Sequence, residues 1–137
     1  MKPEFKLIFG SLRAVLQKHA GALSVKADTV DCYSLEGSAG PAAVRAWGGR
    51  LKQSTIPVAW VQIGKVYVSF HNMCVYGNGK LLDGMSKELK ARMHGKTCFN
   101  FKNHDEGLFE ELEELTAKSL AAFRKAGFIS GPGSKGD

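Results

Sequence analysis

A chain of 137 residues with 44% hydrophobic and 23% charged side chains is long enough for one domain with its own core, so it needs no disulfide or metal to fold. Three widely spaced cysteines without a Cys-x-x-Cys pair exclude a disulfide framework and a zinc ribbon. The formal charge of +6 is uneven, because residues 1–102 carry 15 Lys and Arg against 6 Asp and Glu, whereas residues 103–137 carry 4 against 7. No apolar run of about 18 residues occurs and the first residues do not resemble a signal peptide, so we expect a cytoplasmic protein that does not enter the membrane.

The first long element is an amphipathic helix with a basic outer face. Pro3 suits a first helical turn, and apolar residues recur at three- and four-residue spacing up to Gly21. These apolar residues are Phe5, Ile8, Phe9, Leu12, Val15 and Leu16. Downstream, β-branched and aromatic residues predict a strand over 29–36. Residues 37–49 are rich in glycine and small side chains, which predicts a loop with one helical turn over 42–46.

Two alternating runs over 56–72 predict a β-hairpin around Gly64-Lys65, a pair suited to a tight turn. If Ile63 pairs with Val66, every side chain of the hairpin is assigned to one of two faces. The apolar face, which we expect to meet the core, carries Ala59, Val61, Ile63, Val66, Val68 and Phe70. The second face carries Val58, Trp60, Gln62, Tyr67, Ser69 and His71.

The segment after the hairpin combines a turn, a short helix and a strand. Residues 77–79 predict the turn, and residues 82–93 then follow helical spacing, with Ser86 in a position to cap part of that helix. The aromatic run over 97–101 predicts a short strand.

The last helix opens with Asn103-x-x-Glu106, a capping-box pattern, and is expected to end at Gly127. Because no βαβ alternation is visible, we expect an α+β fold in which an antiparallel sheet carries the N- and C-terminal helices on one face. The domain spans 1–129, and the polar, glycine-rich residues 130–137 are predicted to form a disordered tail.

The stretch after the hairpin also resembles a known family. The resemblance rests on these motifs: Val68-Ser-Phe-His71-x-Met73, Val75-Tyr-x-Asn78, Lys80-Leu-Leu-Asp-Gly84, Ser86-x-Glu-Leu-Lys90, Arg92-Met93 and Gly95-Lys96-x-Cys98-Phe-Asn-Phe-Lys102. Together they are similar to the YdhG-like family of small bacterial domains of unknown function, over roughly residues 55–125. The resemblance implies a frataxin-like α-β sandwich. It also implies a possible iron-handling role, because one member of the family has been assigned as an intracellular iron chaperone.

The best candidate binding surface is the second face of the hairpin. Helices on one side of the sheet would leave Trp60, Tyr67, Ser69 and His71 on a partly open surface that would stack a planar ligand or seat a protein partner. The alternative is that a loop or a second subunit covers this face. Trp47 stands between two arginines in the predicted loop and is a further candidate for ligand binding.

The charged residues give weaker candidates. Glu106, Glu110 and Glu113 fall within about 60° of one another on the last helix and would share a hard cation such as iron, unless they form an ordinary solvated face. Lysines around the short helix form a basic patch, but no nucleic-acid recognition motif accompanies them, so a nucleic-acid partner is not favoured.

We therefore predict a noncatalytic cytosolic binding module, and iron handling is its most specific version. Two alternatives stay open: an enzyme that uses His71 as a general base in a sheet-face pocket, and a basic adaptor for an anionic partner. The sequence leaves open whether the protein is a monomer or a homodimer.

Overall fold

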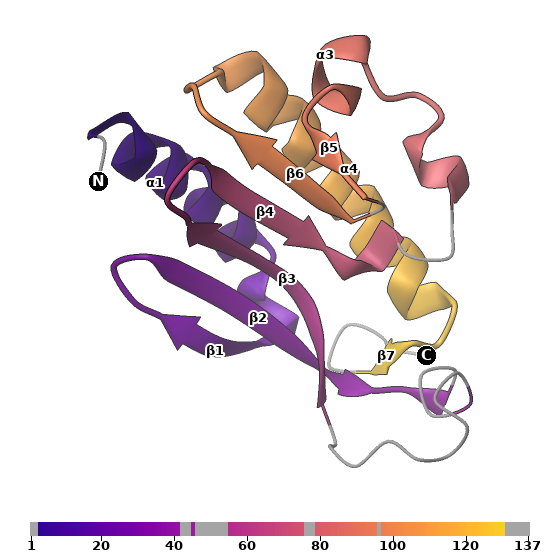
Figure 1. Cartoon of the computed structure of the whole chain (residues 1–137). Helices are drawn as coiled ribbons and strands as arrows, with labels where there is room; N and C mark the ends of the chain where they lie inside the picture. The colour runs from indigo at the N-terminus through magenta and orange to yellow at the C-terminus, as the bar shows by residue number, and fades with distance from the viewer. Residues whose placement is uncertain (1–2, 42–44, 46–54, 76–78, 96, 131–137) are drawn as a thin grey trace.

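The computed structural model describes residues 3–41, 45, 55–75, 79–95 and 97–130, and it confirms the predicted α+β class (Figure 1). In this part of the chain, a 7-stranded antiparallel sheet has the order β1-β2-β3-β4-β6-β5, with β7 paired to β2. The strands are β1 (Ser24–Asp28), β2 (Cys32–Ala39), β3 (Thr55–Ile63), β4 (Val68–Asn72), β5 (Met93–His94), β6 (Cys98–Phe101) and β7 (Ile129–Ser130). The helices are α1 (Pro3–Lys18), α3 (Lys87–Lys90), α4 (Glu106–Lys125) and the short 3-10 helices η1 (Ala20–Ala22), η2 (Met73–Val75) and η3 (Gly79–Leu82).

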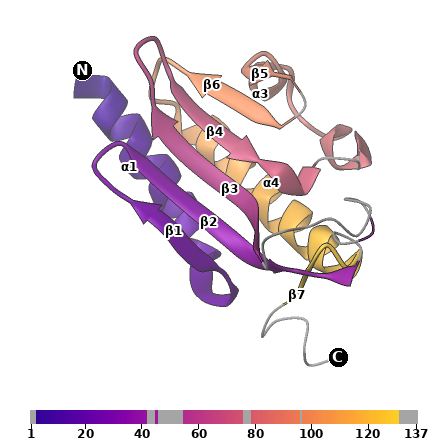
Figure 2. The ribbon, with the colours of Figure 1, turned by 60° about the horizontal axis from the view of Figure 1, so that its bottom comes forward.

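Helices α1 and α4 lie side by side on the same face of the sheet, as predicted (Figure 2). All six apolar residues predicted for the first helix are buried against the sheet and α4. The core is completed by apolar residues of α4 such as Phe109 and Leu112 and by the inward face of the strands. The opposite face of the sheet receives neither of these helices.

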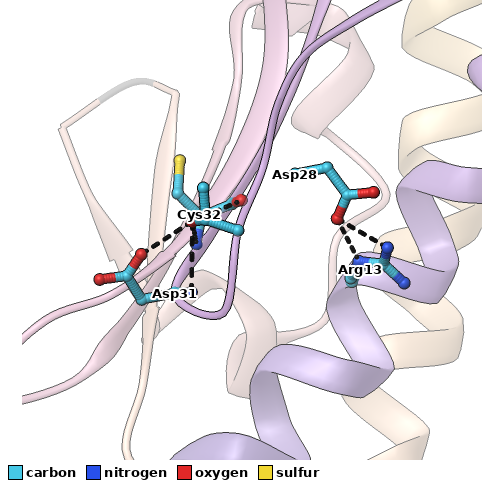
Figure 3. A network of polar contacts seen from close by, with 5 residues as sticks. Arg13, Asp28, Asp31 and Cys32 are labelled. Carbon is cyan, nitrogen blue, oxygen red and sulfur yellow. Dashed lines mark hydrogen bonds and ion pairs between the residues drawn. The ribbon is translucent and has the colours of Figure 1, made fainter.

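An ion pair joins α1 to β1, an edge strand that the sequence did not predict (Figure 3). Arg13 donates from Nε and Nη2 to Asp28 Oδ1 at 3.2 and 2.7 Å, and its guanidinium lies 5.0 Å from the centre of the Tyr33 ring. In the turn to β2, Thr29 Oγ1 donates to Asp31 Oδ1 at 2.9 Å. Strand β1 is mostly exposed and lacks an alternating pattern, so its pairing with β2, rather than its own sequence, makes it a strand.

Strand β2 is shifted relative to the predicted strand over 29–36, because Gly37, Ser38 and Ala39 extend it. Gly37 lies in a strand and not in a loop, and the close packing around it leaves little room for a side chain. A Cβ atom on Gly37 would lie 3.0 Å from Ile129 and 3.3 Å from Val58. The other part of the predicted loop, with its helical turn, falls almost wholly outside the described residues.

The hairpin has a different register from the predicted one, because Ile63 pairs with Val68. The Gly64 N–H donates to the Tyr67 carbonyl at 2.9 Å, so the turn contains two more residues and leaves Val66 55% exposed. A shift by two residues keeps the side chains of the pairs from Ile63–Val68 to Trp60–His71 on their predicted faces, whereas Val66 leaves the core face for the turn. Val58 is a second correction, because it lies at a register shift against β2 and is buried instead of lying on the open face.

Of the two helices that follow the hairpin, α3 begins at the predicted N-cap residue and α4 does not. Ser86 caps α3, because its Oγ accepts from the Leu89 N–H at 3.1 Å, but Met93 belongs to β5 and not to a helix. Helix α4 is capped by Asp105, whose Oδ1 accepts from the Leu108 N–H at 3.1 Å, so the predicted capping box is wrong.

Helix α4 ends just before Gly127, as predicted. Gly127 has a φ of 86°, a conformation that stops the helix. Ser130 then pairs with Ser38 in β7, one residue beyond the predicted domain limit. Residues 131–137 of the predicted tail lie outside the described part of the chain. Among the described helices, none has the length and apolarity that a bilayer crossing requires.

Candidate functional site

The sheet face opposite α1 and α4 carries a row of side chains that runs across the strands. We name it the sheet-face row: Ser34, Trp60, His71, Cys98 and His94, from β2, β3, β4, β6 and β5 in that order. Each member pairs directly with the next across the strands, and paired residues project to the same side of a sheet. His94 is exposed, and the other four are half-buried.

The centre of the row is a stacked pair of rings. The Trp60 and His71 ring centroids lie 4.6 Å apart with an interplanar angle of 17°. This separation is close to the spacing of neighbouring strands, about 4.7–4.9 Å, so the two rings stand upright and side by side on the sheet. The Trp60 ring is thus stacked on His71, and its cross-strand neighbour on the β2 side is the small Ser34.

Hydrogen bonds position the polar side chains beyond His71. The Cys98 Sγ lies 3.7 Å from His71 Nε2 and donates to Asn100 Oδ1 at 3.3 Å. Ser69 Oγ also donates to Asn100 Oδ1, at 3.0 Å. The amide oxygen of Asn100 therefore accepts from both the thiol and the hydroxyl and holds Cys98 beside the imidazole.

The protonation states of this pair do not suit nucleophilic catalysis. Burial lowers the pKa of His71, which keeps the imidazole neutral at physiological pH. Burial raises the pKa of the Cys98 thiol, and a hydrogen bond with Ser69 opposes that shift only in part. A reactive cysteine needs the opposite, a lowered pKa beside a cationic group. The arrangement therefore favours binding over thiol chemistry.

Three of the predicted binding residues are brought together: Trp60, Ser69 and His71. Tyr67 lies in the hairpin turn, four residues and thus about 13 Å along the strand from His71. Trp47 lies outside the described residues.

Sequence reasoning missed three residues of this face: Ser34, Cys98 and Asn100. The contact of Cys98 with His71 depends on the pairing of β4 with β6, which are separated in the chain by η2, η3, α3 and β5. An aromatic run such as 98–101 indicates a strand but not its partner, so no signal in the sequence pointed to this contact.

The predicted carboxylate stripe of α4 faces α1 across a groove. Glu106, Glu110 and Glu113 line a hollow of about 340 Å³ together with Lys18 and Ser11. Lys18 Nζ donates to both carboxylate oxygens of Glu113, at 3.0 and 3.1 Å. Within the described residues, no three side chains of the His, Cys, Asp or Glu type are grouped so as to hold a metal ion. A cation at this stripe would compete with Lys18, and the iron site stays a prediction.

Two further hollows flank α3. One of about 240 Å³ lies against α4 and is lined by Lys80, Met85 and Glu114, and one of about 310 Å³ is lined by Arg92 and Lys102. Neither these two nor the groove beside α1 includes His71. A closed pocket around His71, which the enzyme alternative requires, is thus not among these three hollows.

Compared with known proteins, the chain matches no family model, no curated protein and no solved structure. The roles of its residues therefore rest on the geometry of the sheet-face row.

Proposed function

We propose that the protein is a noncatalytic binding module that holds a small planar heteroaromatic ligand on its open sheet face. The observation that carries this proposal is the upright Trp60/His71 pair. A ring placed over Ser34 would continue the stack on the side of Trp60 that faces β2. Offset stacking on an aromatic side chain contributes about 0.5–1.5 kcal/mol beyond the area that is buried.

The polar neighbours of Trp60 suit a heteroaromatic ring better than a purely apolar one. The Ser34 hydroxyl stands beneath the proposed position, and Gln62 is exposed on the same face of β3. Both side chains donate and accept hydrogen bonds, so ring nitrogens and carbonyl groups would find partners there. Because none of the three hollows described above includes Trp60, we expect micromolar or weaker affinity.

Binding is favoured over catalysis because burial favours the neutral forms of His71 and Cys98, and none of the three hollows described above includes His71. Iron handling, the version implied by the family resemblance, stays a prediction, because the Glu113 carboxylate is already paired with Lys18. The basic adaptor for an anionic partner and the cytoplasmic location also stay predictions.

The test is a titration of the ¹⁵N-labelled chain with indole, adenine and nicotinamide, and with the non-planar cyclohexanecarboxamide as the ligand control. We expect at least one planar compound to shift the indole N–H signal of Trp60, which a Trp60→Phe spectrum identifies. Ser34→Leu fills the proposed position while leaving Trp60 itself in the chain, and it should abolish the shift. Ser38→Leu makes the same change on the same face of β2, about 13 Å away, and should leave it intact.

Two results would contradict the proposal. In one, no planar compound shifts the Trp60 signal. In the other, the shift persists in Ser34→Leu, which would place the ligand elsewhere on the molecule.

A further inference from the structure

The far end of the sheet-face row brings a sulfur and a nitrogen donor close together. His71 Nε2 and Cys98 Sγ lie 3.7 Å apart. The two residues form the closer type of antiparallel pair, because the next pair along the strands is hydrogen-bonded through the Asn72 N–H and the Thr97 carbonyl, at 2.8 Å. The backbone therefore holds both donors in place.

The 3.7 Å contact between Cys98 Sγ and His71 Nε2 is a hydrogen bond between thiol and imidazole, and its length also suits two ligands of a tetrahedral metal ion. With zinc–sulfur and zinc–nitrogen bonds of about 2.3 and 2.0–2.1 Å, a tetrahedral angle places the two donor atoms about 3.6 Å apart. The observed 3.7 Å differs from this value by only about a tenth of an ångström. A metal ion would thus fit between His71 and Cys98 without a movement of the strands.

A third donor stands on the other side of Cys98. His94 pairs with Cys98 across β5 and β6, so its side chain projects from the same face of the sheet. Directly opposite residues have Cβ atoms about 4.5–5.5 Å apart, a distance that an imidazole spans. In the described residues these three side chains are not grouped as a metal site, so the proposed site requires the His94 imidazole to reorient. Its exposure allows that change.

We propose that His71, Cys98 and His94 form a binding site for a transition-metal ion of the zinc or copper class, with the fourth position open to solvent. Thiolate and imidazole donors select such ions, whereas iron in a carboxylate stripe would need hard oxygen donors. On binding, the Cys98 thiol releases its proton to solvent and the sulfur forms the bond to the metal. The hydrogen bond from the Cys98 thiol to Asn100 Oδ1, at 3.3 Å, is given up when the proton leaves. This site does not depend on the proposed stacking function, because it uses neither Ser34 nor the open side of Trp60.

Cobalt(II) added to the reduced full-length chain tests this site, because tetrahedral thiolate coordination gives a near-ultraviolet charge-transfer band and intense visible bands. We expect these bands in the parent chain, and we expect Cys98→Ser and His71→Gln to abolish them. Zinc should displace the cobalt. Cys32→Ser is the matched control, since Cys32 is also half-buried but lies on β2, and it should keep the bands.

His94→Gln tests the third ligand at an exposed position where the fold does not depend on the side chain. We expect it to weaken cobalt binding by at least roughly 10–100-fold, the loss that is usual even for an outer-shell partner. The site is overturned if the parent chain gives no thiolate band or if Cys98→Ser retains it. The assignment of His94 is overturned if His94→Gln binds cobalt as tightly as the parent.

Discussion

The 4 histidines of the chain illustrate how much the surroundings decide what a side chain does. His71 stacks on Trp60, and His94 is exposed at the edge of the sheet. The His104 Nε2 lies 2.8 Å from a serine hydroxyl of α1. The Nε2 of His19 is buried and, in the described residues, has no hydrogen-bond partner. Burial lowers the pKa of both His71 and His19.

His19 should make the folded state less stable in acid. Burial lowers its pKa most, and the charges of Lys18 and Arg124 act in the same direction, while Glu113 opposes them. Because the folded pKa lies below the unfolded value, the unfolded chain binds the proton more readily, and stability falls as the pH drops below about 6.5. His19→Gln removes this contribution.

Urea unfolding between pH 7 and pH 5 checks the His19 prediction. We expect His19→Gln to lose less stability over this range than the parent chain. His94→Gln is the control at an exposed position, and it should follow the parent. An equal loss in His19→Gln and the parent would show that the His19 proton is not coupled to folding.

At the scale of elements, the long helices were predictable and the short strands were not. Helix α1 has a run of apolar residues at helical spacing that specifies its buried face without reference to the sheet. Strands β1, β5 and β7 have 5, 2 and 2 residues. Segments of that length have too few positions to show a period, and they become strands only through a partner such as β2 or β6.

The start of α4 gives a direct test at this scale, because the sequence pattern and the structure place the N-cap differently. Asp105→Ala removes the bond to the Leu108 N–H and should lower the free energy of unfolding by about 1 kcal/mol. Asn103→Ala removes the residue of the predicted capping box and should cost only a few tenths of that. Chemical denaturation of the two variants measures the difference. If Asn103→Ala lowered the free energy of unfolding more than Asp105→Ala, the result would support the predicted capping box instead.

At the scale of the whole molecule, the composition of the open face was predictable but its neighbours were not. The alternation of the hairpin placed Trp60 and His71 on one side, and the shift by two residues left that assignment intact. The positions of Ser34 and Cys98 beside them follow from the order β2-β3-β4-β6. Strand order depends on how the whole chain packs around its core, and local patterns do not contain it.

If the sheet face opposite the two helices is open to a ligand at Trp60, the Trp60 ring must be accessible to solvent. Line broadening by a soluble gadolinium chelate, measured on the labelled chain, tests it directly. We expect the Trp60 indole signal to broaden, and the methyl signals of Val61, which is 0% exposed on the helix side, to stay sharp. A Trp60 indole as well protected as Val61 would mean that this face is covered, and the proposed ligand position at Trp60 would be wrong.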